Sequence, residues 1–350
     1  MKNKIYSKKS FFSKIIIKLA RKFGYEVIDQ AQFFVVSKNI DAKENLSESG
    51  KHSITIPLGK TKITNKIKSL TIIIRSYTFG DIDDGRVMLD QNKKRIFELP
   101  KIEYTLRTIN SIIKSCEIAQ KNFKDFKFKI IITDDKSNKQ SLDRINKLLN
   151  KTNLNTSLIN VGNNEFDDQI QKKDTENKEI SKNMRSNMRN LLKSIEISEN
   201  ENSDLFYFLE DDYIHTNDAI TEILFTYEKI SSQLKKDIFI CPADYPYLYS
   251  NIDNSNIFLG NSKHWRTVKE TLITFLTSKS MIKKYLGELK LMGQIRHHPM
   301  ELKLHEIYEK EVCISPIPSL AMHATHINSI YGIPPNFEWK KIWDENEIND

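Results

Sequence analysis

The chain has 350 residues, of which 39% are hydrophobic and 29% charged, and its 54 Lys and Arg residues against 46 Asp and Glu residues give a formal net charge of +8. This hydrophobic fraction is enough for a large core, and no apolar run approaches the ~20 residues of a membrane-spanning helix. The excess charge lies in residues 1–25, which carry eight bases and no acid, so the rest of the chain is neutral. A general nucleic-acid binder is therefore excluded, because its basic excess would cover the folded body.

The basic segment is predicted to form an amphipathic helix over residues 10–23. Its apolar face carries Phe12, Ile16, Leu19 and Phe23, its bases are Lys14, Lys18, Arg21 and Lys22, and Gly24 is a typical stop signal. A helix of this kind can lie on an anionic membrane surface, so we expect peripheral membrane contact through residues 10–23. The alternative is a helix that packs on the body of the protein or on a second copy of the chain in a homodimer.

The three cysteines, Cys116, Cys241 and Cys313, are isolated and odd in number. This pattern argues against a disulfide framework and a thiolate zinc site, and it favours a reducing compartment. We therefore expect a cytoplasmic protein, held at the inner face of the plasma membrane if the basic helix binds lipid.

From residue 69 onward, short β-branched runs alternate with helical spacing. We predict strands at 70–75, 126–133, 157–161 and 204–209, with helices at 104–119, 142–149 and 184–197 between them. This alternation predicts an α/β fold with a mostly parallel, Rossmann-like sheet flanked by helices. In such sheets, ligands bind beyond the carboxyl ends of the strands.

Further elements are predicted after residue 213. They are helices at 219–234, 281–291 and 298–310, and strands at 237–241, 271–276 and 312–317. The predicted organisation is an amphipathic helix and linker over 1–68, one α/β domain over 69–330 with halves 69–213 and 214–330, and an exposed tail over 331–350.

Acidic residues follow two of the predicted strands: Asp134 and Asp135 after the second, and Glu210, Asp211 and Asp212 after the fourth. Alternate residues beyond a strand end can point the same way, so Glu210 and Asp212 are expected to face one pocket. Carboxylate oxygens suit Mg²⁺ or Mn²⁺, and such a cation can neutralise a departing diphosphate. The alternative is that Asp212 or Asp218 simply caps the following helix.

The order of these motifs between Leu70 and His326 resembles that of the GT-A glycosyltransferases, and within them glycosyltransferase family 2. Five segments carry the resemblance: Ile-Ile-Ile-Arg-Ser-Tyr at 72–77, Ile-Ile-Ile-Thr-Asp-Asp-Lys-Ser at 130–137, Ser-Asn-Met-Arg-Asn at 186–190, Phe-Leu-Glu-Asp-Asp at 208–212 and, more loosely, Leu-Ile-Thr-Phe-Leu-Thr at 272–277. The fourth stands at the place of the family's D-x-D metal motif, in an E-D-D form. The resemblance implies a GT-A fold and a metal-dependent, inverting transfer of a hexosyl or N-acetylhexosaminyl group from a nucleotide-diphosphate sugar to a hydroxyl acceptor.

The resemblance also implies roles for single residues. The nucleotide part of the donor is expected to contact Arg75, Ser76, Tyr77, Asp134, Asp135, Arg189 and Asp211. The divalent cation, Mn²⁺ or Mg²⁺, is expected on Asp212, Glu210 and His323, with His326 as the alternative to His323. Where the family has a Glu-Asp dipeptide, this chain has Met300-Glu301, so Glu301 is expected to deprotonate the acceptor hydroxyl. Its alternative role is a first-turn acid that stabilises a helix.

Asp244 is the rival candidate for the base. It adjoins Tyr245 and Tyr247, whose rings suit a sugar acceptor, although it can equally be a turn residue before a proline. A diphosphate clamp and a stacking platform are expected from His264, Trp265 and Arg266, in a lid over 251–266 that closes on the donor. Together with the basic helix, the resemblance favours a cell-envelope glycan or a lipid-linked sugar as the acceptor.

Two other functions fit parts of the sequence. A nucleotidyltransferase of related fold would usually show a Gly-rich phosphate loop with a Lys near the first strand, which residues 75–80 lack. A catalytically degenerate scaffold that binds a nucleotide sugar would be consistent with the Met-Glu departure at 300–301. The donor sugar, the nucleotide base and the acceptor depend on the shape of the pocket, which the motifs do not specify.

Overall fold

The structure, a computed structural model, describes residues 11–25, 53–56, 59–78, 97, 99–250, 254–325 and 329–348. The chain divides into two compact units, Met1–Thr64 and Asn65–Asp350, close to the predicted boundary at residue 68. The first unit contains helix α1 (Phe11–Lys22) and an antiparallel hairpin of β1 (Ser53–Ile56) and β2 (Gly59–Lys62). His326 and the lid residues 251–253 lie outside the described residues.

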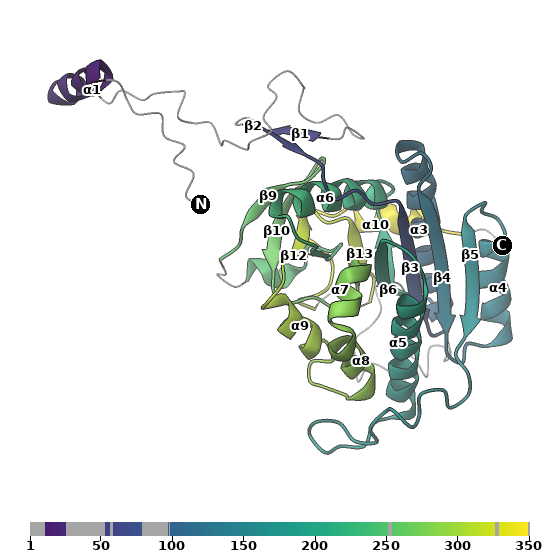
Figure 1. Cartoon of the computed structure of the whole chain (residues 1–350). Coiled ribbons are helices and arrows are strands. Elements are labelled where there is room, and N and C mark those ends of the chain that lie inside the picture. Colours follow the sequence, from purple (N-terminus) through teal and green to yellow (C-terminus); the bar gives the residue numbers. More distant parts are fainter. Residues whose placement is uncertain are drawn as a thin grey trace. The chain divides into compact units, whose positions relative to one another are not determined.

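A nine-stranded sheet in the order β5-β4-β3-β6-β11-β8-β12-β10-β9 runs through the second unit (Figure 1). Its strands are β3 (Ser69–Ser76), β4 (Lys127–Asp134), β5 (Asn155–Asn160), β6 (Leu205–Glu210), β8 (Phe239–Ile240), β9 (Ile257–Leu259), β10 (His264–Val268), β11 (Phe275–Ser278) and β12 (Cys313–Ile317). The half from β5 to β6 is entirely parallel, whereas β11 runs antiparallel to both of its neighbours. The other half is mixed, because β8 and β12 pair in parallel while β10 pairs antiparallel with β12 and β9. The predicted α/β fold is confirmed.

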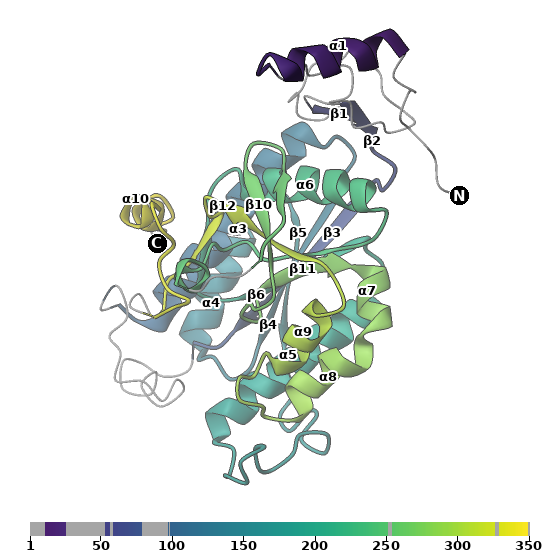
Figure 2. The same cartoon turned by 90° about the vertical axis from the view of Figure 1, so that its left-hand side faces the viewer.

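Helices cover both faces of this sheet. They are α3 (Lys101–Asn122), α4 (Lys139–Leu149), α5 (Lys182–Asn200), α6 (Ala219–Leu234), α7 (Lys279–Lys284), α8 (Leu286–Gln294), α9 (Leu302–Tyr308) and α10 (Trp339–Glu345). In Figure 2, α5, α7, α8 and α9 lie together on one side of the sheet. Helix α3 packs against α4 and α6 on the other side. A short ribbon of β7 (Tyr213–His215) and β13 (Ala321–His323) lies apart from the main sheet.

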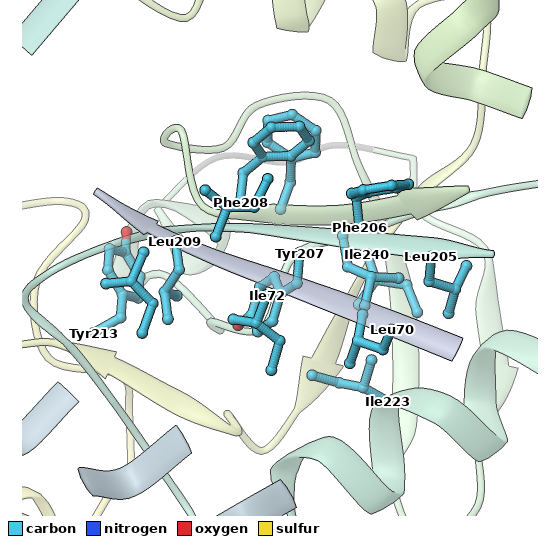
Figure 3. Packing of buried hydrophobic residues seen from close by; sticks show 14 of the residues in the cluster. Leu70, Ile72, Leu205, Phe206, Tyr207, Phe208, Leu209, Tyr213, Ile223 and Ile240 are labelled. Carbon is cyan, nitrogen blue, oxygen red and sulfur yellow. The ribbon is translucent and has the colours of Figure 1, made fainter. Parts of the chain in front are cut away.

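Strand β6 shows why the sequence folds this way. Its first five residues are all buried, as expected for a central strand with helices on both faces. Figure 3 shows Phe206 and Phe208 on one side of the strand and Tyr207 and Leu209 on the other. This central strand therefore holds the acidic residues that follow it in a fixed place.

Helix α5 begins at a sequence signal that sets its position. The hydroxyl of Ser181 accepts a hydrogen bond from the backbone N–H of Met184 at 3.2 Å, a standard N-cap. One face of the helix packs under the carboxyl ends of β3 and β4 through residues that include Asn190. The cap thus determines which residues of α5 reach the edge of the sheet.

The C-terminal segment differs from the expected exposed tail. Trp343 of α10 is only 3% exposed and stacks on Phe97, with ring centroids 3.9 Å apart. The guanidinium of Arg107 lies 4.3 Å from the centre of the same indole ring. The tail prediction is wrong because it overlooked two tryptophans four residues apart, a spacing that gives a helix an apolar face.

Candidate active site

Strands β3, β4 and β6 end at one edge of the parallel half-sheet. In register, Arg75 lies beside Glu210, and Ser76 lies beside Asp134. The parallel arrangement therefore gathers polar residues from three distant segments of the chain at the place where α/β sheets bind ligands.

Asp135 and Arg189 form a buried ion pair beneath this edge. The Oδ2 atom of Asp135 accepts hydrogen bonds from Arg189 Nε at 3.1 Å and from the Ser186 hydroxyl at 2.5 Å. Arg189 also pairs with Asp167 at 2.8 Å. The other carboxylate oxygen of Asp135, Oδ1, is buried and has no hydrogen-bond partner among the described residues. Such an atom is suited to receive a donor group from a ligand.

Asp134 instead shapes the turn after β4. Both of its oxygens are used by Ser137, at 2.9 Å from the backbone N–H and 2.5 Å from the hydroxyl. Burial raises the pKa of Asp134, and the hydrogen bonds from Ser137 oppose that rise. The side-chain amide of Asn190 fixes the two strand ends by donating to the carbonyls of Ser76 at 2.9 Å and Thr133 at 3.1 Å.

Asp211 faces helix α3. Its Oδ2 atom accepts hydrogen bonds from the backbone N–H of Tyr77 at 3.1 Å and from the Thr105 hydroxyl at 2.8 Å, while Oδ1 lies 2.7 Å from the ammonium of Lys101. The hydroxyl of Tyr77 donates to Asn183 on α5 at 3.1 Å. Asp211 thus holds the segment after β3 against α3, and its predicted contact with the nucleotide would be made through Tyr77.

Asp212 and His323 come together although they are 111 residues apart in the sequence. Asp212 Oδ2 lies 3.3 Å from His323 Nε2 and accepts a hydrogen bond from the Thr325 hydroxyl at 2.5 Å. The pairing of β7 with β13 sets Tyr213 opposite His323, and their rings stack with centroids 4.8 Å apart. The pairing of β7 with β13 therefore positions His323 beside Asp212, which follows the end of β6.

The electrostatics of this pair favour charge on both partners. Burial opposes ionisation of Asp212, but Lys101, His323 and Thr325 hold its pKa well below the usual range. Burial likewise lowers the pKa of His323, and the neighbouring Asp212 outweighs this and raises it. The Nδ1 atom of His323 lies 3.2 Å from the carbonyl of Tyr331, which can only accept, so Nδ1 carries a proton and Nε2 faces Asp212.

The carboxylate oxygen of Asp212 and the Nε2 atom of His323, once it has lost its proton, fit a small divalent cation. Adjacent ligands on octahedral Mg²⁺ are about 3 Å apart, because each bond is about 2.1 Å long, and the observed 3.3 Å is close to this. Within the described ranges, no group of three His, Cys, Asp and Glu side chains has metal-binding geometry. A cation here would have two protein ligands and would take the others from water or substrate phosphates, the usual pattern for Mg²⁺. The ammonium of Lys101, 3.6 Å from Asp212 Oδ2, lies at the same place.

Glu210 lies on the α5 side of this edge. Its carboxylate is 3.3 Å from Arg75 Nη2 and accepts a hydrogen bond from the Thr274 hydroxyl at 3.2 Å. Arg75 in turn donates to Asn187 on α5 at 3.0 Å. The predicted third metal ligand is therefore engaged with an arginine in this arrangement.

Glu301 precedes α9, and its carboxylate belongs to the same electrostatic cluster as Glu210 and Arg75. Burial, reinforced by the negative charge of Glu210, raises the pKa of Glu301 to about 7, although Arg296 and Arg75 oppose the rise. Within the described part of the chain, the carboxylate of Glu301 accepts a hydrogen bond from its own backbone N–H and forms no ion pair or hydrogen bond with another residue. A carboxylate that no other residue engages and whose pKa is near neutrality has the properties of a general base.

Asp244, the rival base, is engaged on both oxygens. One forms a buried ion pair with Arg266, and the other accepts a hydrogen bond from the Tyr249 hydroxyl at 2.5 Å. The guanidinium of Arg266 also lies 4.4 Å from the centre of the Tyr249 ring. Burial raises the pKa of Asp244, while Tyr249 and Arg266 oppose the rise. The group therefore fastens the short helix η2 (Pro246–Tyr249) to β10.

Other residues expected in an acceptor loop are packed inside the protein. Trp265 lies on strand β10, is fully buried, and donates its indole N–H to Glu222 on α6 at 3.2 Å. A sugar cannot stack on this ring, so the expected platform is corrected to a core residue. Arg266 is committed to Asp244, and His264 is exposed on the same strand. Tyr245 and Tyr247 are also buried and bond to Tyr213 and to the Glu270 carbonyl.

Several residues of the site were not predicted from the sequence. They are Lys101, Thr105, Asn183, Asn187 and Thr325. Lys101 alone carries a local signal, because a base in the first turn of a helix opposes the helix dipole and so indicates another role. The others are ordinary polar residues whose importance comes from tertiary contacts.

No protein-family model matches the sequence, and no curated protein matches it significantly. Similar solved structures include S. aureus TarS 1–349 in complex with UDP, with a TM-score of 0.33, 12% identity and coverage of 65% of this chain and 55% of that chain. UTP-bound UGPase from Acinetobacter baumannii gives a TM-score of 0.38 at 9% identity, covering 74% of this chain and 88% of that one. Galactosyltransferase LgtC with donor and acceptor sugar analogs gives 0.33 at 10% identity, covering 70% and 72%.

This chain matches about half the length of TarS 1–349 and 29% of the longer TarS chain. Likenesses at these TM-scores and identities establish neither a family nor an activity.

Proposed function

We propose that this chain is a GT-A glycosyltransferase that moves a sugar from a nucleotide-diphosphate donor to a hydroxyl acceptor. The observation that carries the proposal is the meeting of Asp212 Oδ2 and His323 Nε2, 3.3 Å apart, at the end of a buried central strand. Two further features support it. The parallel half-sheet ends in polar residues at the same edge, and the carboxylate of Glu301 belongs to the same cluster.

The donor nucleotide would lie over the ends of β3 and β4. The unpartnered Oδ1 of Asp135 is an acceptor for an N–H group of the base, and Arg189 holds that carboxylate in place. The backbone after β3, which Tyr77 anchors to Asp211, would follow the nucleotide. These groups bind and orient the donor without taking part in bond breaking.

Asp212 and His323 would hold Mn²⁺ or Mg²⁺ on the diphosphate. When bound, the cation supplies positive charge to the leaving group as the glycosidic bond breaks. The ammonium of Lys101 lies beside Asp211 and Asp212 and would add a second positive charge near the departing oxygens.

Glu301 would accept the proton of the acceptor hydroxyl. As the hydroxyl oxygen bonds to the anomeric carbon, the bond to the diphosphate breaks on the opposite face, so the configuration inverts. We propose a cell-envelope glycan or a lipid-linked sugar as the acceptor, and the cytoplasm as the compartment. The three cysteines are all buried and free, which suits that compartment.

A thermal-shift panel tests the proposal. The full chain is heated with UDP, GDP, CDP or ADP, each with and without Mn²⁺, and Asp212→Asn is compared with Asp143→Asn, an exposed control on α4. At a hundred times the Kd, a ligand adds about 2.7 kcal/mol of stability, which is a Tm rise of about 5 °C for a chain of this size. We expect one nucleotide to give this shift only with Mn²⁺, and only in wild type and Asp143→Asn.

Incubation with donor sugars then identifies the reaction. Release of a nucleoside diphosphate supports a glycosyltransferase, whereas release of pyrophosphate from a nucleoside triphosphate and a sugar phosphate would identify a nucleotidyltransferase. Tight binding without either product would identify a scaffold. A nucleotide shift that is independent of both Mn²⁺ and Asp212 would overturn the metal assignment.

A further inference from the structure

Helix α1 leaves its apolar side chains in solvent. Five large hydrophobic residues of α1 and the turn after it are at least half exposed: Phe11 at 75%, Phe12 at 77%, Ile16 at 57%, Leu19 at 52% and Phe23 at 75%. At about 100° per residue, Phe12, Ile16, Leu19 and Phe23 lie within an arc of about 60°. A contiguous apolar stripe of this kind marks a surface that binds something.

The opposite side of the same helix is basic. Lys14, Lys18 and Arg21 occupy it, Lys22 lies on its flank, and residues 11–25 contain no acid. The remainder of the chain, from residue 26 onward, is neutral overall and offers no net negative charge to attract these bases. Two copies of α1 that met along their apolar stripes would bury those stripes but would leave all eight bases without counter-charges. The matching partner is therefore an apolar layer with a negatively charged surface.

We propose that α1 is a docking site for an anionic lipid bilayer. The helix has 12 residues and is about 18 Å long, which is too short to span a bilayer. It would lie in the plane of the membrane interface, with its apolar stripe among the acyl chains and its bases among the phosphates. Among the described residues, no helix combines the length and the apolar character of a membrane span. The inference is independent of the proposed function, since it rests on α1 alone.

Vesicle co-sedimentation of the full chain tests this. Vesicles of phosphatidylcholine alone are compared with vesicles that also contain phosphatidylglycerol, at low and high salt. We expect binding to the anionic vesicles, weaker binding to the neutral ones, and loss of binding as salt is raised. Replacing three bases together, as Lys14→Gln, Lys18→Gln and Lys22→Gln, is expected to weaken the binding on the order of a hundredfold at low salt.

A matched pair of substitutions isolates the apolar stripe. Ile16 on α1 and Ile257 on β9 are both 57% exposed. Ile16→Asp is expected to reduce binding at least tenfold, whereas Ile257→Asp should bind as wild type does, and both should unfold at the wild-type temperature. Equal binding by Ile16→Asp and wild type would overturn the proposal. So would the absence of vesicle binding together with a concentration-dependent dimer in sedimentation velocity, because the partner would then be a second copy.

Discussion

Glu301 and Asp244 are two carboxylates that both precede a short helix, but they differ in their hydrogen-bond and ion-pair partners. Each is two residues from a proline, Pro299 for Glu301 and Pro246 for Asp244, and each lies in the second half of the α/β domain. Asp244 has both oxygens occupied, by the guanidinium of Arg266 and by the hydroxyl of Tyr249. The carboxylate of Glu301 pairs with no other residue in the described part of the chain, and its pKa is raised to about 7.

The difference shows that burial alone does not identify a base. Desolvation raises the pKa of both carboxylates. At Asp244, however, Arg266 and Tyr249 bind the carboxylate and so connect β10 to η2. At Glu301 the neighbouring negative charge of Glu210 adds to the rise, and no side chain of another residue holds the carboxylate, so it stays available for a proton. The two residues are therefore expected to respond in opposite ways to substitution.

The largest effect is expected at Glu301. Glu301→Gln keeps the shape of the side chain and removes its ability to take a proton, and general bases contribute about 10² to 10⁴ in rate. We expect kcat for sugar transfer to fall by about 10³ while the donor nucleotide binds as before. Glu306→Gln, an exposed residue on the same helix, is the matched control and should keep wild-type activity. Wild-type kcat in Glu301→Gln would remove Glu301 from the mechanism.

The pH profile gives a smaller effect of known sign. A base is active when ionised, so a pKa raised to about 7 moves the acidic limb of kcat/KM from the ordinary range of glutamate up to neutrality. We expect kcat/KM to fall about tenfold per pH unit below pH 7. The residual activity of Glu301→Gln should lack this limb. A wild-type profile that stays level down to pH 5 would contradict the assignment of Glu301.

The strands of the parallel half of the fold could be predicted from the sequence because each is a short, continuous apolar run. The run from Leu70 to Arg75 and the strand before Glu210 are uninterrupted and apolar, so their type and their polar ends could be predicted. The pairing of Asp212 with His323 was reached through a resemblance in motif order. Physically it depends on the contact between β7 and β13, each of three residues, which is too short for a pattern to predict.

The second half was less predictable because its aromatic residues, which a sequence pattern assigns to a sugar-binding loop, are buried in the core. Trp265 looks like a sugar platform in sequence, but the alternation of strand β10 turns it inward to Glu222. Tyr245 and Tyr247 likewise look like rings for a sugar acceptor, but they are buried and bond to Tyr213 and to the Glu270 carbonyl. In both cases, long-range contacts determine the environment, and a local pattern carries no information about them.

Asp244 offers the smallest expected effect on activity and the clearest contrast with Glu301. Asp244→Asn leaves the buried guanidinium of Arg266 without its counter-charge, and breaking a buried pair in this way costs about 3 kcal/mol of unfolding free energy. Urea unfolding should show that loss, while kcat changes by no more than about threefold. In the double variant Asp244→Asn with Arg266→Met, no unpaired charge remains, so its destabilisation should be less than the sum of the two single effects. A hundredfold loss of kcat in Asp244→Asn at wild-type stability would reverse the comparison and make Asp244 the base.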